Sequence, residues 1–159
     1  RVLFRSDGLV VRWGLNSRLD NLQAAILSEK LKIFPQEIER RRSIAHIYHE
    51  RLKGLEDLVL PPAPNEDPDH FDIYQNYEIE SGSRETLREH LQNKGIGTII
   101  QWAGKAVHQF RGLGFEDVKL PFTEVFMKRC FLLPMNTSLS DEEVHYICDQ
   151  VTSFYGSRN

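Results

Sequence analysis

Apolar residues recur three or four positions apart through the first third of the chain, with polar residues between them. This spacing places the apolar residues on one face of a helix. The clearest run consists of Leu15, Leu19, Leu22 and Ile26. Pro35 interrupts the pattern, because proline lacks a backbone N–H and clashes with the preceding helical turn. We therefore predict one long helical arm over residues 18–53 that kinks or restarts at Pro35.

Capping signals mark the starts of helices at both ends of the chain. Ser17 and Asp20 have the S-x-x-D spacing of a capping motif, so we predict that Ser17 caps the arm. Ser140 and Glu143 form a capping box that predicts a final helix. The apolar face of that final helix carries Val144, Ile147, Val151 and Phe154.

The segment between these helices has the patterns of short strands and short helices. The predicted strands are a half-buried one with Phe71, Ile73, Tyr77 and Ile79, a second over 98–102, and a buried one over 130–135. The predicted helices begin at Ser83, with Gly95 at the end, and at Pro121. The predicted loops cover 61–69 and 103–120.

Together these elements predict an α+β fold, in which a long kinked helical arm is followed by a small sheet with helices packed on one face. We expect residues 1–53 to form an N-terminal segment with a long connecting helix. Residues 54–159 are then expected to form a small α+β domain.

Composition excludes several classes of function. The chain has 159 residues, with 20 Lys and Arg against 23 Asp and Glu, so its net charge of −3 gives no basic surplus for binding nucleic acid. No apolar run is long enough to span a membrane and no signal peptide is evident, which indicates a cytoplasmic protein. Cys130 and Cys148 are too few for a disulfide framework or a metal cluster. The absence of an initiator methionine before Arg1 indicates a piece of a longer protein.

The helical arm carries two polar groups that we interpret as solvent-exposed. His46 and His49 lie three positions apart with no third metal ligand, so a solvated helix face is the simpler interpretation. Arg40, Arg41 and Arg42 are interpreted in the same way, as a solvated face rather than an anion site.

The stretch after the predicted second strand is the best candidate for chemistry. It carries Trp102, Lys105, His108 and Gln109, with Gly104 allowing close approach of a ligand to the backbone. An aromatic ring, a cation, an imidazole and an amide at a strand end can recognise a polar, anionic ligand. The alternative is that Trp102 belongs to the core and the others are solvated loop residues. The pattern alone does not separate these two interpretations.

Several motifs occur in an order that resembles a known family. They are "GLNSRLDNLQAAIL" from residue 14, then "RRSIAHIYHERL", "LPP", "YQNYEI", "KGIGT", "LPFTE" and "LLPMNTSLSDEEV". In this order they resemble the DegT/DnrJ/EryC1/StrS family, which are pyridoxal-phosphate-dependent aminotransferases acting on nucleotide-linked keto-sugars. The resemblance runs from about Gly14 to Phe154. It implies that glutamate is the usual amino donor.

The resemblance implies a role for the opening motif at a dimer interface. It assigns Asn16 to the cofactor phosphate of the neighbouring subunit in a homodimer. An Asn16 amide just outside a helix capped by Ser17 can donate to an anion near the positive end of that helix. Arg18 is then either an active-site residue or part of a salt bridge across the dimer.

The resemblance also implies which parts of the enzyme lie outside this chain. The cofactor lysine belongs to a large domain upstream, and the seven lysines here lie in unlike contexts. The chain therefore looks like the C-terminal portion of a fold type I aminotransferase, with no catalytic residue of its own and no transaminase activity alone. A non-enzymatic binding or oligomerisation module, or a regulator, that shares this fold is the alternative.

Substrate contacts are implied at the candidate loop. The family commonly has His-Tyr-Pro where this chain has Gln101-Trp102-Ala103, while His108 keeps a later histidine. The residues that we expect to contact the nucleotide-sugar are Trp102, Lys105, His108 and, more weakly, Tyr74, for which a structural strand position is the simpler interpretation.

Overall fold

The computed structural model describes residues 2–4, 10–13, 19–115 and 117–157. The chain divides into two compact units, each described here by itself. The first unit is Arg1–Lys32 with Ile100–Lys128, and the second unit is Ile33–Ile99 with Arg129–Asn159. The predicted domain boundary after residue 53 stays a prediction.

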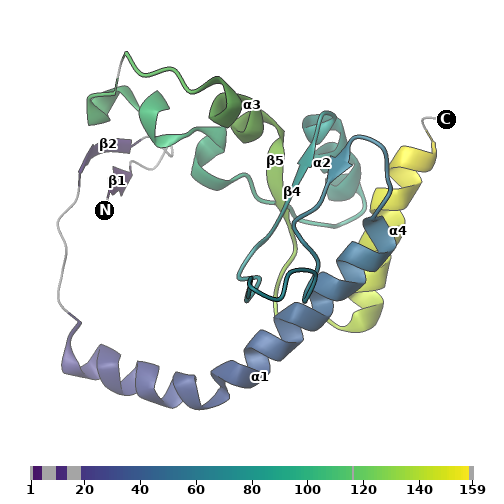
Figure 1. The fold of residues 1–159 in the computed structure, drawn as a ribbon, viewed down its shortest axis with the longest axis horizontal. Coiled ribbons are helices and arrows are strands. Elements are labelled where there is room, and N and C mark those ends of the chain that lie inside the picture. Colours follow the sequence, from purple (N-terminus) through teal and green to yellow (C-terminus); the bar gives the residue numbers. More distant parts are fainter. Residues whose placement is uncertain (1, 5–9, 14–18, 116, 158–159) are drawn as a thin grey trace. The chain divides into compact units, whose positions relative to one another are not determined.

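The helical arm is one continuous helix, α1 (Asn21–Leu52), which contains Pro35 in its interior (Figure 1). The helix therefore does not restart at Pro35, and the alternative that it kinks there stays a prediction. A proline inside a helix costs about 3 kcal/mol, chiefly through one lost backbone hydrogen bond and a steric clash. Burial of the helix downstream offsets this cost, because packing supplies most helical stability in proteins. The buried residues of α1 are Ile44, Ala45, Tyr48 and Leu52.

The cap of α1 lies three residues later than predicted. The backbone N–H of Gln23 donates to Asp20 Oδ1 at 2.7 Å, so Asp20 is the capping residue and the helix begins at Asn21. Ser17, the predicted cap, lies outside the described residues. The apolar residues next to this cap and along the first turns of α1 are largely exposed. They include Leu19, Leu22, Ile26 and Leu31.

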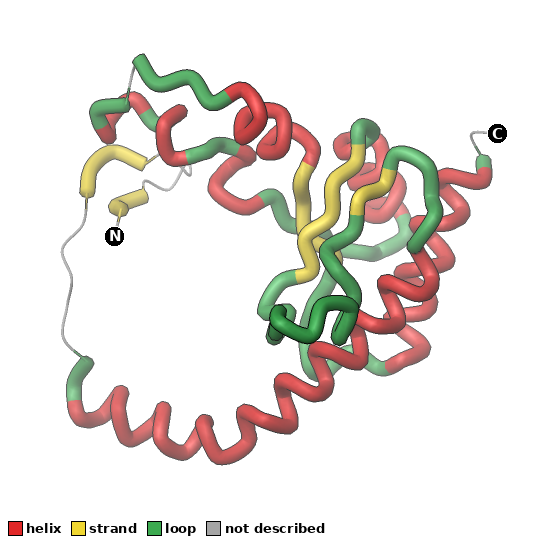
Figure 2. The backbone as a smooth tube through the Cα atoms, viewed as in Figure 1, coloured by secondary structure: helices red, strands yellow, loops and turns green. Residues whose placement is uncertain are grey.

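The second unit contains a three-stranded antiparallel sheet in the order β3–β4–β5 (Figure 2). Its strands are β3 (Leu58–Val59), β4 (Tyr77–Ser81) and β5 (Cys130–Leu133). Tyr77 pairs with Leu133 and Ile79 pairs with Phe131. Burial alternates along β4, as expected for a strand with one face in the core. All of β5 is buried, which confirms the predicted buried strand.

Helices pack against this sheet to form the core of the second unit. Tyr48 of α1 is fully buried, and its ring centroid lies 4.9 Å from that of Tyr77 in β4. The helix α2 (Arg84–Asn93) buries Leu87 and Leu91, as predicted. The last helix, α4 (Asp141–Gly156), buries the four residues of its predicted apolar face. The α+β fold predicted from the sequence is confirmed.

The first unit contains two further strands and the start of helix α3. The strands β1 (Val2–Phe4) and β2 (Val10–Trp13) form an antiparallel pair, which the sequence pattern did not predict. The helix α3 (Pro121–Arg129) begins in this unit at the predicted proline. Proline is favoured at the first position of a helix because its missing N–H is not needed there.

Two predicted strands differ from the structure. The strand β4 begins only at Tyr77, because the N–H of Tyr74 donates to Asp72 Oδ1 at 2.7 Å and Tyr74 adopts a φ of 49°. This local turn prevents extended pairing upstream. The predicted strand over 98–102 is reduced to a single bridge between Ile99 and Leu132.

The arginine run of α1 is not a solvated face, which corrects the prediction. Arg40 Nη1 donates to Asp141 Oδ1 at 2.6 Å, at the start of α4. Arg41 Nη1 donates to the Gln75 carbonyl at 3.0 Å. These arginines therefore attach α1 to α4 and to the loop before β4.

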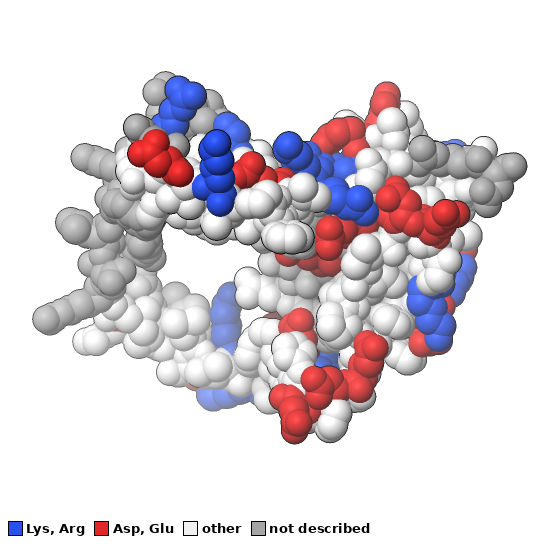
Figure 3. Space-filling model, turned by 45° about the horizontal axis from the view of Figure 1, so that its top comes forward, with Lys and Arg blue, Asp and Glu red and all other residues white. Residues whose placement is uncertain are grey.

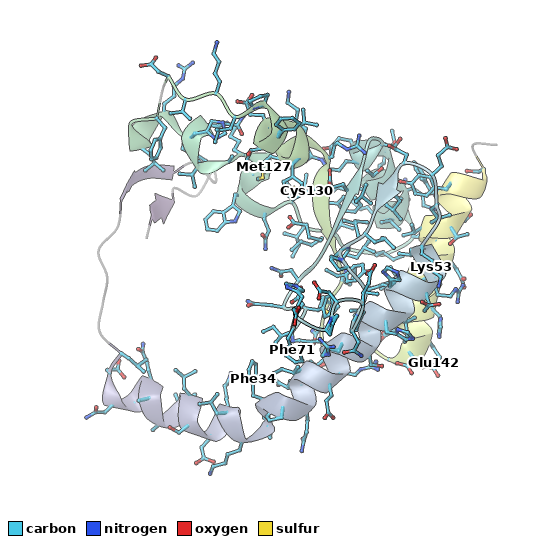
Figure 4. The ribbon with its side chains drawn as sticks, viewed as in Figure 1. Phe34, Lys53, Phe71, Met127, Cys130 and Glu142 are labelled. Atoms are coloured by element: carbon cyan, nitrogen blue, oxygen red, sulfur yellow. The ribbon has the colours of Figure 1, made fainter. Side chains whose placement is uncertain are left out.

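Arg42 binds the same loop more extensively. Its Nη1 donates to the Asp72 carbonyl at 2.6 Å, and its guanidinium carbon lies 4.4 Å from the Phe71 ring centroid. Figure 4 labels Phe71 beside α1. The contact is a cation–π interaction, which is favourable at this distance. The run therefore holds elements of the second unit together, and the described contacts do not make it an anion site.

The predicted capping box of α4 is present and provides a test of local stability. Ser140 Oγ accepts the N–H of Glu143 at 3.2 Å, and Glu143 Oε2 accepts the N–H of Ser140 at 2.9 Å. We expect Ser140→Ala to lower the free energy of unfolding by about 1 kcal/mol, because one helix donor loses its partner. Urea denaturation measures this change. The control is Ser153→Ala, an exposed position in the last turn of α4; an equal or greater loss there would contradict the prediction.

Candidate functional site

The candidate loop is more regular than predicted. Residues 101–113 form three short 3₁₀ turns, whereas the sequence predicted the end of a strand and a loop. The turns are η1 (Gln101–Gly104), η2 (Val107–Gln109) and η3 (Arg111–Leu113). Turns of three or four residues lack the periodicity that a sequence pattern can detect. Phe110 and Leu113 are buried and pack with Phe115, so the loop has a small apolar anchor of its own.

The first turn has an unusual backbone. Trp102, Ala103 and Gly104 have φ angles of 55°, 54° and 67°, so three consecutive residues are left-handed. Only glycine adopts this conformation freely, and each of the other two costs about 1–3 kcal/mol. Strain of this size persists only where surrounding contacts enforce it. The backbone therefore marks this turn as a candidate functional segment.

The turn exposes an aromatic ring and a cation. The Trp102 side chain is 51 % exposed, so the alternative that Trp102 belongs to the core is wrong. Lys105 is also exposed, and its N–H donates to the Trp102 carbonyl at 3.1 Å. An indole face and an ammonium group three residues apart can bind a ligand with a ring and an anionic group.

His108 is buried, in contrast to Trp102 and Lys105. Its side chain is 6 % exposed, and its Nε2 lies 3.2 Å from Glu124 Oε1. The same carboxylate oxygen accepts the N–H of Leu120 at 3.1 Å. The hydrogen bond from His108, followed by that from Leu120, lowers the pKa of Glu124 below its usual value. An ionised carboxylate only accepts hydrogen bonds, so His108 Nε2 is the donor in this contact.

Glu124 is the residue of this site that the sequence analysis missed. It lies in the first turn of α3, where an acid is favoured by the helix dipole whatever its other contacts. The only signal in the sequence is its place in "LPFTE", one of the motifs that carry the family resemblance. No spacing rule connects it to His108, which is 16 residues earlier.

The other candidate residues lie in the second unit or outside the described residues. Tyr74 belongs to the second unit, where it is 3 % exposed and its hydroxyl donates to the Pro62 carbonyl at 2.8 Å. Burial raises the pKa of this phenol. Tyr74 is thus a buried loop residue rather than a strand residue, and its substrate contact stays a prediction. Asn16 and Arg18 lie outside the described residues.

The described residues do not form a site for pyridoxal phosphate, the cofactor that the resemblance implies. A lysine that binds this cofactor must reach it inside an enclosed site. All seven lysines are exposed, and Lys32 and Lys53 form ion pairs with Glu29 and Glu50. Lys53 lies at the end of α1 (Figure 4). No chemical step involving the cofactor can therefore be assigned to the described residues.

In the described part of the chain, no group of three or more His, Cys, Asp and Glu could hold a metal ion. None of the helices described is both long and apolar enough to cross a bilayer. On the face drawn in Figure 3, basic side chains are interspersed with acidic ones, which agrees with the net charge of −3.

Comparison with known proteins identifies relatives over most of the chain. A pleiotropic regulatory protein of Geobacillus stearothermophilus is 33% identical over 145 residues, which are 89% of this chain and 38% of that protein. The UDP-2-acetamido-2-deoxy-3-oxo-D-glucuronate aminotransferase of Pseudomonas aeruginosa is 31% identical over 143 residues, again 38% of that protein. The chain thus spans about two-fifths of the length of these relatives.

Solved structures agree with the fold. A DegT DnrJ EryC1 StrS aminotransferase from Brucella abortus has a TM-score of 0.73 at 34% identity, covering 90% of this chain and 38% of that one. DesV of S. venezuelae, solved in complex with a ketimine intermediate, has a TM-score of 0.78 at 28% identity. The match covers 89% of this chain and 38% of the DesV chain. The model of the DegT/DnrJ/EryC1/StrS aminotransferase family matches residues 4–152. The chain therefore belongs to this family.

Proposed function

We propose that this chain is part of a longer pyridoxal-phosphate-dependent aminotransferase that transfers an amino group from glutamate to a nucleotide-linked keto-sugar. The observation that carries the proposal is the family match over residues 4–152. Relatives named as aminotransferases of UDP-linked and dTDP-linked sugars support the substrate class. Because the chain spans about two-fifths of these relatives, we propose that the cofactor lysine lies in the remainder of the protein.

In this proposal the loop of the first unit binds the nucleotide-sugar. Lys105 pairs with an anionic group of the nucleotide diphosphate, and the exposed Trp102 ring stacks on a base or sugar ring. Both groups are accessible in the described structure, which supports the assignment. Tyr74 is the weaker candidate, because its hydroxyl already donates to the Pro62 carbonyl.

Asn16 is proposed to hold the cofactor phosphate across a homodimer interface, with Arg18 beside it. We expect Asn16→Ala in the complete protein to weaken retention of pyridoxal phosphate about tenfold, since one hydrogen bond to a charged group is worth about 1.5–3 kcal/mol. Equilibrium dialysis of the cofactor measures this. Asn21→Ala, just after the Asp20 cap, is the control. Equal affinity in the wild type and Asn16→Ala would contradict the assignment.

The proposed function is tested by a transamination assay on the complete protein. Keto-sugars linked to UDP, dTDP and GDP are each incubated with glutamate, and formation of 2-oxoglutarate and of the amino-sugar is followed by mass spectrometry. We expect one nucleotide series to be aminated. Absence of amination in all three, with folded and cofactor-loaded protein, would contradict the proposal.

A regulatory role is the second candidate. It is favoured by the names of two relatives. These are the pleiotropic regulatory protein and the erythromycin biosynthesis sensory transduction protein EryC1 of Saccharopolyspora erythraea. A regulator without transaminase activity would bind the nucleotide-sugar and leave glutamate unchanged in the same assay. The assay therefore separates the two candidates.

A further inference from the structure

The backbone around Lys105 is fixed on both sides by hydrogen bonds. On one side, its own N–H donates to the Trp102 carbonyl at 3.1 Å. On the other side, the N–H of Ala106 donates to Gln109 Oε1 at 2.9 Å, and the N–H of Gln109 donates back to the Ala106 carbonyl at 2.9 Å. These bonds are local and hold the loop in shape. They do not by themselves attach the loop to the rest of the first unit.

The contact between His108 and Glu124 supplies such an attachment. It joins η2 to α3, and it is largely shielded from water because the His108 side chain is 6 % exposed. The carboxylate is itself oriented, since its Oε1 also accepts the N–H of Leu120 just before α3. Glu124 and His108 therefore connect α3 to the segment that carries Lys105, so that a shift of α3 would also move this segment.

This geometry changes the role of His108. The sequence analysis predicted that His108 contacts the nucleotide-sugar, but its Nε2 is engaged by Glu124 and most of its ring is covered. Of the candidate residues in the loop, Trp102 and Lys105 are exposed. A buried imidazole held by a carboxylate fixes geometry, as a second layer of residues does around many functional sites.

We propose that Glu124 is a positioning residue for nucleotide-sugar binding, which holds His108 and thereby keeps Trp102 and Lys105 in their binding arrangement. This inference rests on the proposed function. It differs from a purely structural role because it predicts a change in sugar-nucleotide affinity without a change in the rate of the glutamate half-reaction.

The first readout is independent of activity. Hydrogen exchange of peptides covering residues 101–109 is measured in the complete protein for the wild type, Glu124→Ala and Glu124→Gln. We expect at least tenfold faster exchange in Glu124→Ala and nearly normal exchange in Glu124→Gln, whose amide oxygen still accepts from Nε2. Asp117→Ala is the matched control, an exposed acid of the same unit. Unchanged exchange in Glu124→Ala would overturn the inference.

The second readout is kinetic. We expect Glu124→Ala to raise the KM for the nucleotide-sugar about tenfold, the size of one lost charged hydrogen bond, with the rate of the glutamate half-reaction unchanged. The double variant with His108→Ala should be no worse than Glu124→Ala, because the two residues act as one unit. Additive losses, or an unchanged KM despite faster exchange, would overturn the inference. A wild-type protein that neither binds nor aminates any nucleotide-sugar would instead overturn the proposed function.

Discussion

The 159-residue chain alone is expected to form no 2-oxoglutarate from glutamate when pyridoxal phosphate and a nucleotide-linked keto-sugar are supplied. The reason is the placement of its lysines. All seven are exposed, so none is enclosed with a cofactor, and a free aldehyde bound reversibly to a surface amine does not turn over as an enzyme does. The complete protein is expected to be active in the same assay.

The comparison that decides this prediction is the rate with the chain against the rate with pyridoxal phosphate and free lysine. Equal rates are expected. Turnover by the chain well above that background would contradict the prediction. Lys105 would then be the first lysine to replace, because it lies in the candidate loop.

The largest expected loss of stability follows from truncating Phe131. This side chain is fully buried in β5, where Phe131 pairs with Ile79 of the central strand β4. Removing a buried phenyl ring costs about 3–5 kcal/mol, from lost burial and from the cavity left behind. Domains of this size are stable by about 5–15 kcal/mol, so Phe131→Ala is expected to remove a large share of that stability.

The chain provides a matched control for this substitution. Phe122 is 92 % exposed, so Phe122→Ala is expected to change the free energy of unfolding by less than about 0.5 kcal/mol. Urea denaturation of both variants, followed by circular dichroism, gives the comparison. A Phe131→Ala midpoint as high as that of Phe122→Ala would contradict the assignment of β5 to the core.

The parts of the fold that the sequence predicted correctly are those with strong local signals. The capping box at Ser140 and the apolar face of α4 are both patterns within a single helix, and the buried strand β5 is predicted from one short run of apolar residues. The cap of α1 was misplaced because Ser17 and Asp20 are both good capping residues and lie only three positions apart. Local patterns do not decide between two such neighbours.

The contacts that the sequence did not predict join residues that are distant along the chain. Arg40 and Asp141 are 101 positions apart, and His108 and Glu124 are 16 positions apart. No rule of sequence spacing predicts either contact, because each contact depends on how helices and turns pack together. This is why the arginine run was predicted to be a solvated face and why Glu124 was not connected with His108. Trp102 and Lys105 are exposed, and their contact with a substrate stays a prediction.

We propose that this chain is part of a longer transaminase and that the cofactor lysine lies outside these 159 residues. The most direct test is the visible absorbance spectrum of the chain and of the complete protein with pyridoxal phosphate, before and after glutamate is added. We expect a protein-bound cofactor band in the complete protein and not in the 159-residue chain, and we expect glutamate to bleach or shift this band. A band in the 159-residue chain that borohydride fixes covalently, or no band in either protein, would contradict it.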